Sequence, residues 1–136
     1  MDSEAARELI TRSHRAVLAT RRADGGTQMS PVLAAVDDAG RVCISTRETA
    51  MKTAHLRREP YAALCALSEG FFGDWAQVEG PVEIVELPDA MDLLVDYFRR
   101  VSGEHPDWAD YRAAMQAERR VLLRLTVERA GPQRAG

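Results

Sequence analysis

The stretch from Ser45 to Thr53 has the residue types and the spacing best suited to holding an anion. Ser45 and Thr46 end an apolar, strand-like run, and a helix-like segment follows with Lys52 in its first turn. The start of a helix presents free backbone N–H groups and the positive end of the helix dipole. Hydroxyls and a lysine at that place would complete a phosphate site. The alternative is a capped surface helix with a solvated lysine. A lysine in the first turn opposes the helix dipole, which favours the functional interpretation.

A second stretch, from Gln28 to Leu33, combines a strand pattern with polar side chains and an internal proline, Pro31. Proline cannot donate a hydrogen bond in the middle of a sheet, so we expect an edge strand or a strand that faces a ligand. An ordinary edge strand is the alternative.

Other residue types that could do chemistry lack the spacing for it. Asp37 and Asp38 are followed by Gly40, a pattern typical of a turn rather than of an acid–base pair. The sequence contains no Ser-His-Asp elbow and no glycine-rich nucleotide loop. We predict no metal site, because none of the three histidines has a cysteine or carboxylate at metal-ligand spacing: His14, His55 and His105.

The composition is that of a folded, single-domain protein. The chain has 136 residues, of which 46% are hydrophobic and 29% charged, and its net charge of -3 gives no reason to expect a nucleic-acid partner. It has no apolar run near the ~20 residues that span a bilayer and no secretion signal, so we expect no membrane partner. Cys43 and Cys65 lie in apolar runs and are expected to be reduced core thiols, which indicates a cytoplasmic protein.

Hydrophobic periodicity predicts four helices and six strands. The expected helices are Ser3 to Arg12, Thr49 to Glu59 with Thr49 as N-cap, Pro88 to Ser102, and Asp107 to Arg119 with Asp107 as cap. The expected strands are His14 to Arg21, Gln28 to Val36, Arg41 to Thr46, Tyr61 to Leu67, Trp75 to Leu87, and Val121 to Val127.

The connections between these elements predict an α+β, mainly β, barrel with peripheral helices. Turns at Ala23–Gly26 and Asp37–Gly40 are too short for parallel crossovers, so the first three strands should form a meander. Gly80-Pro81 should bend or bulge the fifth strand. Tyr61 to Leu67 is apolar throughout, which favours burial of both faces by barrel closure or by a partner subunit. Residues 1–129 should form one domain, followed by a flexible tail over 130–136.

The order and spacing of these segments resemble the pyridoxamine-phosphate-oxidase-like, FMN-binding split β-barrel superfamily. The resemblance is nearest to its actinobacterial branch that uses the deazaflavin coenzyme F-420, and it implies a six-stranded antiparallel split barrel. The matching segments are Ala16–Thr20, Gln28–Val32, Ile44–Thr46, Lys52-Thr53, Leu56–Pro60, Val78–Gly80, Gly103–Trp108, Asp110–Arg112 and Arg119–Leu123.

The resemblance also implies a set of cofactor-binding residues. The ring and ribityl chain would lie along the strand residues Gln28, Met29, Ser30, Pro31 and Val32. The phosphate end would be held at Ser45, Thr46, Met51, Lys52 and Thr53, and Trp75 is an aromatic residue that could reach the cofactor of a partner subunit. The sequence does not identify a catalytic residue.

Two departures separate this chain from the flavin-using oxidases that it resembles. Met51 stands where those enzymes keep an arginine beside the phosphate lysine, and Thr126 to Arg129 with a short tail stand where they carry an arginine-rich, substrate-gripping segment. Both departures favour the deazaflavin branch over pyridoxamine phosphate oxidation.

The implied function is a coenzyme F-420-dependent oxidoreductase that transfers hydride to a small conjugated acceptor such as an enone, a quinone or a tetrapyrrole. The cofactor supplies the chemistry and the protein binds and orients it. Two alternatives stay open: an FMN-dependent oxidase or reductase of the same fold, and a non-catalytic protein that binds the cofactor or a haem-like ligand. We expect a homodimer with cofactor sites between its subunits.

Overall fold

The structure of the chain is a computed structural model that describes residues 2–131. It contains four helices and eight strands within that range. The helices are α1 (Ser3–Ser13), α2 (Met51–Arg58), α3 (Ala90–Ser102) and α4 (Trp108–Ala117). The strands are β1 (Arg15–Arg21), β2 (Thr27–Leu33), β3 (Ala35–Val36), β4 (Val42–Arg47), β5 (Tyr61–Leu67), β6 (Trp75–Val85), β7 (Arg120–Leu125) and β8 (Arg129–Gly131).

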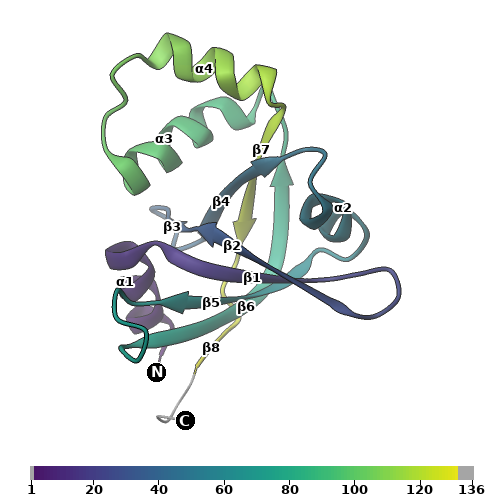
Figure 1. Cartoon of the computed structure of the whole chain (residues 1–136), viewed down its shortest axis with the longest axis vertical. Coiled ribbons are helices and arrows are strands. Elements are labelled where there is room, and N and C mark those ends of the chain that lie inside the picture. Colours follow the sequence, from purple (N-terminus) through teal and green to yellow (C-terminus); the bar gives the residue numbers. More distant parts are fainter. Residues whose placement is uncertain (1, 132–136) are drawn as a thin grey trace.

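The strands form an antiparallel split barrel, as the resemblance implied (Figure 1). Their order is β2-β1-β5-β6-β7-β4-β3, and β8 pairs with β6. The two ends of this order, β2 and β3, are consecutive along the chain and are separated only by Ala34. The sheet therefore curls back on itself through its own backbone.

The expected count of six strands was too low for two reasons. The segment predicted as one strand from Gln28 to Val36 is interrupted at Ala34, whose N–H donates to the carbonyl oxygen of His14. Its first part pairs with β1 and its second part with β4, so the predicted meander is confirmed in its connections but divided between two sheets. In addition, Ala130 and Gly131, expected in the tail, pair with β6 as part of β8. The rest of that tail lies outside the described residues.

Strand β6 passes from one sheet to the other at the predicted Gly80-Pro81 step. Up to Pro81 it pairs with β5, and from Val82 it pairs with β7. Gly80 is required there, because a Cβ built on it would lie 1.7 Å from the carbonyl oxygen of Thr126. The backbone of β6 and the segment just after β7 can approach this closely only without a side chain at Gly80.

Two hydrophobic clusters hold the elements together. The larger one fills the barrel and includes Leu9 and Ile10 of α1 and Leu56 of α2. The second packs the apolar face of α3, with Leu94 and Val95, and α4 against the outside of the barrel. Asp107 caps α4 as predicted by accepting a hydrogen bond from the N–H of Asp110.

The prediction for the start of α2 was wrong. The N-cap is Ala50 rather than Thr49, and no side chain caps the helix. A turn in which the N–H of Ala50 donates to the carbonyl oxygen of Arg47 moves the N-cap one residue along the chain. The hydroxyl of Thr53 donates to the same oxygen at 2.7 Å, which fixes the helix start from inside.

Candidate functional site

Strands β2 and β4 diverge from β3 and, with α2 at their open end, bring together most of the residues predicted to hold a cofactor (Figure 1). We call this arrangement the fork. One arm is β2, which ends the strand order and, among the described strands, pairs with β1 alone. The other arm is β4, which leads directly into α2. Gln28–Val32 therefore lie on one arm, Ser45 and Thr46 on the other, and Lys52 at the open end.

Lys52 differs from the other cations near it because no group among residues 2–131 engages it. It is the only lysine of the chain and is half-buried. Its ammonium forms no ion pair or hydrogen bond with any of residues 2–131. Three nearby arginines are engaged: Arg47 by Glu118, Arg57 by Glu86, and Arg58 by the carbonyl oxygen of Arg21. Of these four cations, Lys52 is the one available to an external anion.

The first turn of α2 adds hydrogen-bond donors beside that ammonium. The N–H of Thr53 donates back to the carbonyl oxygen of Ala50 at 3.1 Å. The N–H groups of Met51 and Lys52 come before it and have no acceptor within the described part of the chain. Free N–H groups at the positive end of a helix dipole, with an unpaired ammonium, form a donor set that suits a phosphate.

The three hydroxyls predicted near this site do not point the same way. Ser45 and Thr46 are successive strand residues, so their side chains lie on opposite faces of β4. Thr46 is buried, at 5% exposure, whereas Ser45 is half-buried. Thr53 is fully buried, and its hydroxyl proton is used by the carbonyl oxygen of Arg47. Ser45 is thus the hydroxyl of the three that is partly open to a ligand.

The β2 arm is an edge strand, as Pro31 predicted. Its residues alternate: Gln28, Ser30 and Val32 are half-buried, and Met29 and Pro31 are exposed. The side-chain oxygen of Gln28 is buried and has no hydrogen-bond partner, and it is the one such side-chain atom among residues 2–131. A buried acceptor without a donor is costly, so it fits a site where a ligand donor completes the contact.

A buried polar pair that the sequence analysis missed lies next to Gln28. Thr20, its cross-strand neighbour in β1, forms a 3.0 Å hydrogen bond with Nδ1 of His55. Both partners are buried, at 3% and 4% exposure. This bond ties α2, which carries Lys52, to the strand beside the β2 arm. In the sequence, Thr20 is a polar residue in an apolar strand and His55 a polar residue on an apolar helix face. Nothing in the sequence indicates that these two residues pair with each other.

Tyr97 of α3 is a second contact that the sequence analysis missed. Its hydroxyl donates to the carbonyl oxygen of Leu33 at 2.8 Å, at the end of the β2 arm. Burial raises the pKa of Tyr97 above its ordinary value. The phenol therefore stays protonated and holds the closed end of the fork.

Met51 and Trp75 lie at different distances from this donor set. Met51 precedes Lys52 and is 62% exposed. Because methionine is uncharged, this position adds no second cation to the donor set. Trp75 begins β6, opposite Leu67, and is separated from β2 by β5 and β1. Strands are about 4.8 Å apart, so three strand spacings separate Trp75 from the β2 arm of its own chain. Within the single chain, β5 and β1 therefore lie between Trp75 and the β2 arm.

The remaining candidate groups are structural. Both cysteines are free, and Cys43 lies in the core as expected, whereas Cys65 is only half-buried on the outer face of β5. Burial, followed by the charge of Asp37, raises the pKa of the Cys43 thiol to about 12, which leaves it protonated and unreactive at neutral pH. Asp37 accepts hydrogen bonds from the N–H groups of Ala39 and Arg41, which confirms a turn rather than an acid–base pair. Within residues 2–131, no group of three or more His, Cys, Asp or Glu side chains could hold a metal ion.

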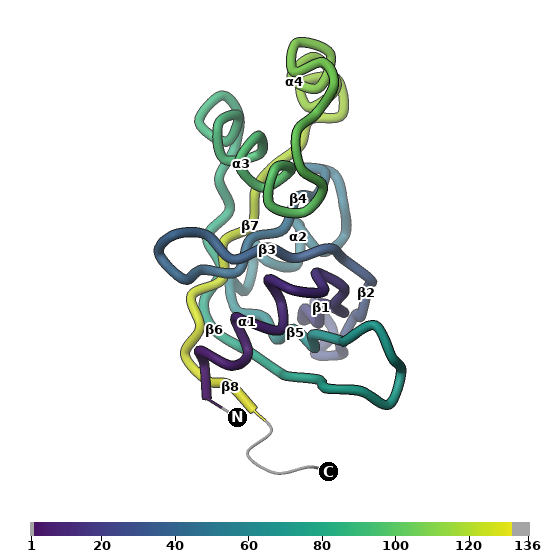
Figure 2. Tube along the Cα trace, turned by 90° about the vertical axis from the view of Figure 1, so that its left-hand side faces the viewer, coloured from purple at the N-terminus to yellow at the C-terminus, as the bar shows by residue number. Residues whose placement is uncertain are grey.

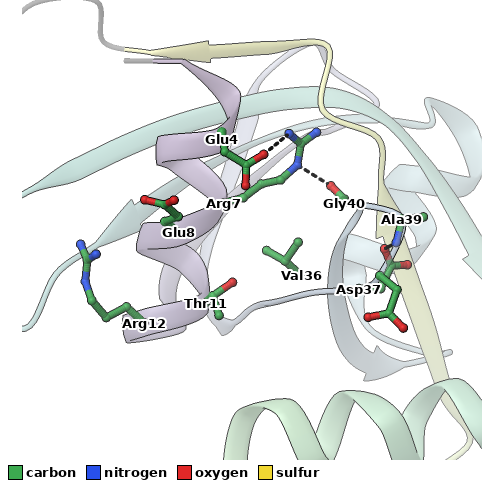
Figure 3. A pocket seen from close by; sticks show the side chains of 10 residues that line it. Glu4, Arg7, Glu8, Thr11, Arg12, Val36, Asp37, Ala39 and Gly40 are labelled. Carbon is green, nitrogen blue, oxygen red and sulfur yellow. Dashed lines mark hydrogen bonds and ion pairs between the residues drawn. The ribbon is translucent and has the colours of Figure 1, made fainter.

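A hollow of about 730 Å³ lies away from the fork, between α1 and the β3–β4 turn (Figure 3). Arg7 spans one side of it and donates to the carbonyl oxygen of Gly40 at 2.8 Å. Its lining includes exposed charged side chains such as those of Glu8 and Arg12. This hollow is the junction of two elements rather than the expected cofactor site.

Solved structures with the same fold include proteins of several kinds. A conserved hypothetical protein from Mycobacterium tuberculosis is 25% identical, with a TM-score of 0.77 over 100% of this chain and 92% of that one. A structure named F420 reductase is 21% identical, with a TM-score of 0.71 over 91% and 94% of the two chains. A heme binding protein from Mycobacterium smegmatis is 18% identical, with a TM-score of 0.73 over 97% of this chain and 55% of that one.

Two further findings bear on the class of protein. None of the helices in the described range has both the length and the apolar character needed to cross a membrane. Residues 2–134 match the sequence family described as pyridoxamine 5'-phosphate oxidase, which covers more than half of the chain. Together with the split barrel, this match supports a fold of the flavin- and deazaflavin-binding oxidoreductase type. The chain therefore belongs to the pyridoxamine 5'-phosphate oxidase family.

Proposed function

We propose that the protein is an oxidoreductase that uses the deazaflavin coenzyme F-420 and reduces a small conjugated acceptor. The observation that carries the proposal is Lys52, an ammonium that no described residue pairs with, beside the free N–H groups of Met51 and Lys52 at the start of α2. A phosphate bound there would gain a charge-assisted contact and two backbone hydrogen bonds.

The residues of the β2 arm suit the remainder of such a cofactor. Its free edge and the unpaired oxygen of Gln28 could accept a hydrogen bond from a ring N–H. Ser30 and Val32 lie on the same face of the strand as Gln28 and would line the ring or its side chain. When bound, the reduced deazaflavin supplies a hydride, and the chain's own part is to bind it, orient it and exclude water.

The choice of deazaflavin over FMN is supported by position 51. Met51 is exposed beside Lys52 and adds no positive charge, so a single side-chain cation serves the phosphate. An FMN phosphate carries about two charges and would gain more from a second cation. A structure named F420 reductase has this fold, which is consistent with deazaflavin as the cofactor; at 21% identity, the likeness shows the fold alone. FMN is the second candidate, favoured by the family match itself.

We further propose that the cofactor site is completed by a second subunit. Two observations support this arrangement. The outer face of β1, β2 and β5 is half-exposed, and Trp75 is separated from the fork of its own chain by two strands. Trp75, at 40% exposure, would then contribute to the site of the partner.

A direct comparison of cofactors tests the proposed function. Purified protein is titrated with coenzyme F-420 and with FMN while cofactor fluorescence is followed. We expect nearly colourless protein that binds the deazaflavin more tightly. Yellow protein carrying stoichiometric FMN, or tighter binding of FMN, would reverse the choice. Oxidation of the reduced deazaflavin by an enone, quinone or tetrapyrrole then distinguishes an enzyme from a carrier.

A further inference from the structure

The connection between β5 and β6 carries two aromatic side chains that the single chain leaves in solvent. Phe71 is 86% exposed and Phe72 is 96% exposed. Their rings pack edge to face on each other, with centroids 4.9 Å apart. Figure 2 shows that this connection extends away from the barrel on the side of β1 and β2. We call this pair the aromatic knob. Burying large aromatic rings is favourable, so the exposure of these two needs a reason.

An apolar groove lies on the same side of the molecule. It has a volume of about 410 Å³ and is formed mainly by Val17, Pro31, Leu33 and Leu67, with Arg15 at its rim. Val17 is opposite Pro31 and Cys65 in the strand register, so the groove crosses the outer face of three neighbouring strands. Leu67 is the last residue of β5, one position before the connection that carries the knob.

The charges around the two features are complementary. Glu69 and Asp74 flank the knob, and both are exposed. Arg15, at the rim of the groove, is also exposed. None of the three side chains forms an ion pair with any residue in the described range of 2–131. Acidic groups beside the knob therefore match a basic group beside the groove.

We propose that a second copy of this chain docks on this face, with the aromatic knob of each subunit in the apolar groove of the other. A two-fold axis makes such an interface self-complementary, since each copy offers both a knob and a groove. Glu69 and Asp74 of each copy then face Arg15 of the other. This inference specifies the interface of the homodimer proposed above.

The same charges argue against a membrane as the partner. Aromatic loops that enter a lipid surface are favoured by basic neighbours, because the membranes they bind carry negative charge. Here the residues beside the knob are acidic and the chain has a net charge of -3. A protein surface with an arginine at its rim fits these neighbours better.

Sedimentation equilibrium of the full chain without cofactor tests the interface. We expect a dimer, and the double substitution F71S/F72S should raise its dissociation constant at least about thirty-fold, the effect of losing a central interface contact. The exposed rings contact little in their own subunit, so the variant should unfold at an unchanged urea concentration. F71L/F72L keeps apolar bulk and should retain most of the affinity.

A charge exchange supplies an independent readout. R15E should weaken the dimer, and R15E/E69R should restore part of the affinity, whereas R112E on the distant helix α4 makes the same charge change without effect. A monomer at about 100 μM, or a dimer that none of these substitutions changes, would overturn the proposal. So would a monomer that sediments with anionic lipid vesicles only when Phe71 and Phe72 are present. Because no cofactor is used, failure here is separate from failure of deazaflavin binding.

Discussion

Single residues decide how the phosphate end of the site works, and Lys52 is the main one. Arginines surround it, yet each of those nearby is engaged by a carboxylate or a carbonyl oxygen of the protein. An unpaired cation at the start of a helix gains little for stability, because it opposes the dipole there. Its position is better explained by a ligand than by the fold.

The substitution Lys52→Ala should weaken deazaflavin binding without unfolding the protein. A charge-assisted phosphate contact is worth roughly 1.5–3 kcal/mol, or about ten- to a hundred-fold in dissociation constant. Fluorescence titration at matched ionic strength measures the change. Lys52→Arg keeps the charge and should lose less, and Arg112→Ala on α4 serves as a control. An unchanged dissociation constant for Lys52→Ala would show that the anion binds elsewhere.

At the scale of elements, the fork exists because two strands change partners within a few residues. Ala34 separates β2 from β3, and Gly80-Pro81 transfers β6 from one sheet to the other. The hydrogen bonds from Tyr97 to Leu33 and between Thr20 and His55 then hold the two ends of the fork. The relative position of β2 and α2 thus depends on contacts that are remote in sequence.

The substitution Gly80→Ala should destabilise the fold strongly. The added Cβ would lie 1.7 Å from the backbone oxygen of Thr126, so either β6 or the segment after β7 must move. We expect a loss of about 3 kcal/mol or more in the free energy of unfolding, measured by urea denaturation. Gly70→Ala, where the nearest heavy atom is 4.0 Å from the added Cβ, is the matched control and should be nearly neutral. Equal stabilities of the two variants would contradict the close approach.

The β3–β4 turn should contribute stability that depends on pH through Asp37. Partial burial raises the pKa of Asp37. This effect is outweighed by hydrogen bonds from the backbone N–H and the guanidinium of Arg41, by the positive charge of Arg41, and by a hydrogen bond from the N–H of Ala39. The pKa of Asp37 is therefore below its ordinary value of 3.8. A group whose pKa is lower in the folded state stabilises the fold above its unfolded pKa, and this contribution disappears as pH falls through the folded pKa.

The substitution Asp37→Asn should therefore cost roughly 1–3 kcal/mol at pH 7, and the cost should shrink below about pH 4. Urea unfolding of the two proteins at several pH values measures the difference. Asp38→Asn is the neighbouring control, because that side chain is 97% exposed and its ion pair should be worth little. A difference between wild type and Asp37→Asn that stays constant down to pH 2 would show that the carboxylate charge is not involved.

At the scale of the whole molecule, one chain leaves the outer face of β1, β2 and β5 partly uncovered. In β5, Ala62, Leu64 and Ala66 are buried, but Ala63 and Cys65 between them are only half-buried. The expectation that both faces of this strand are buried is not met within a single chain. A second subunit is what would cover the outer face.

Deazaflavin affinity should consequently depend on protein concentration. If the site is completed across the subunit boundary, dilution below the dimer dissociation constant should weaken binding by at least about ten-fold, because the monomer lacks the partner's contacts. Titrations at several protein concentrations, matched to sedimentation data, measure this linkage. Affinity that is identical for monomer and dimer would place the whole site within one chain.

The sequence by itself determined the element types, the antiparallel connections of the barrel and the edge position of the strand with Pro31. These follow from local patterns of period, turn chemistry and capping, which neighbouring residues decide. Only the tertiary structure decided that one predicted strand is divided at Ala34, that Thr46 and Thr53 are buried while Lys52 stays unpaired, and that Thr20 meets His55. Each of these depends on contacts between segments far apart in the chain, where packing and register rather than local preference select the partner.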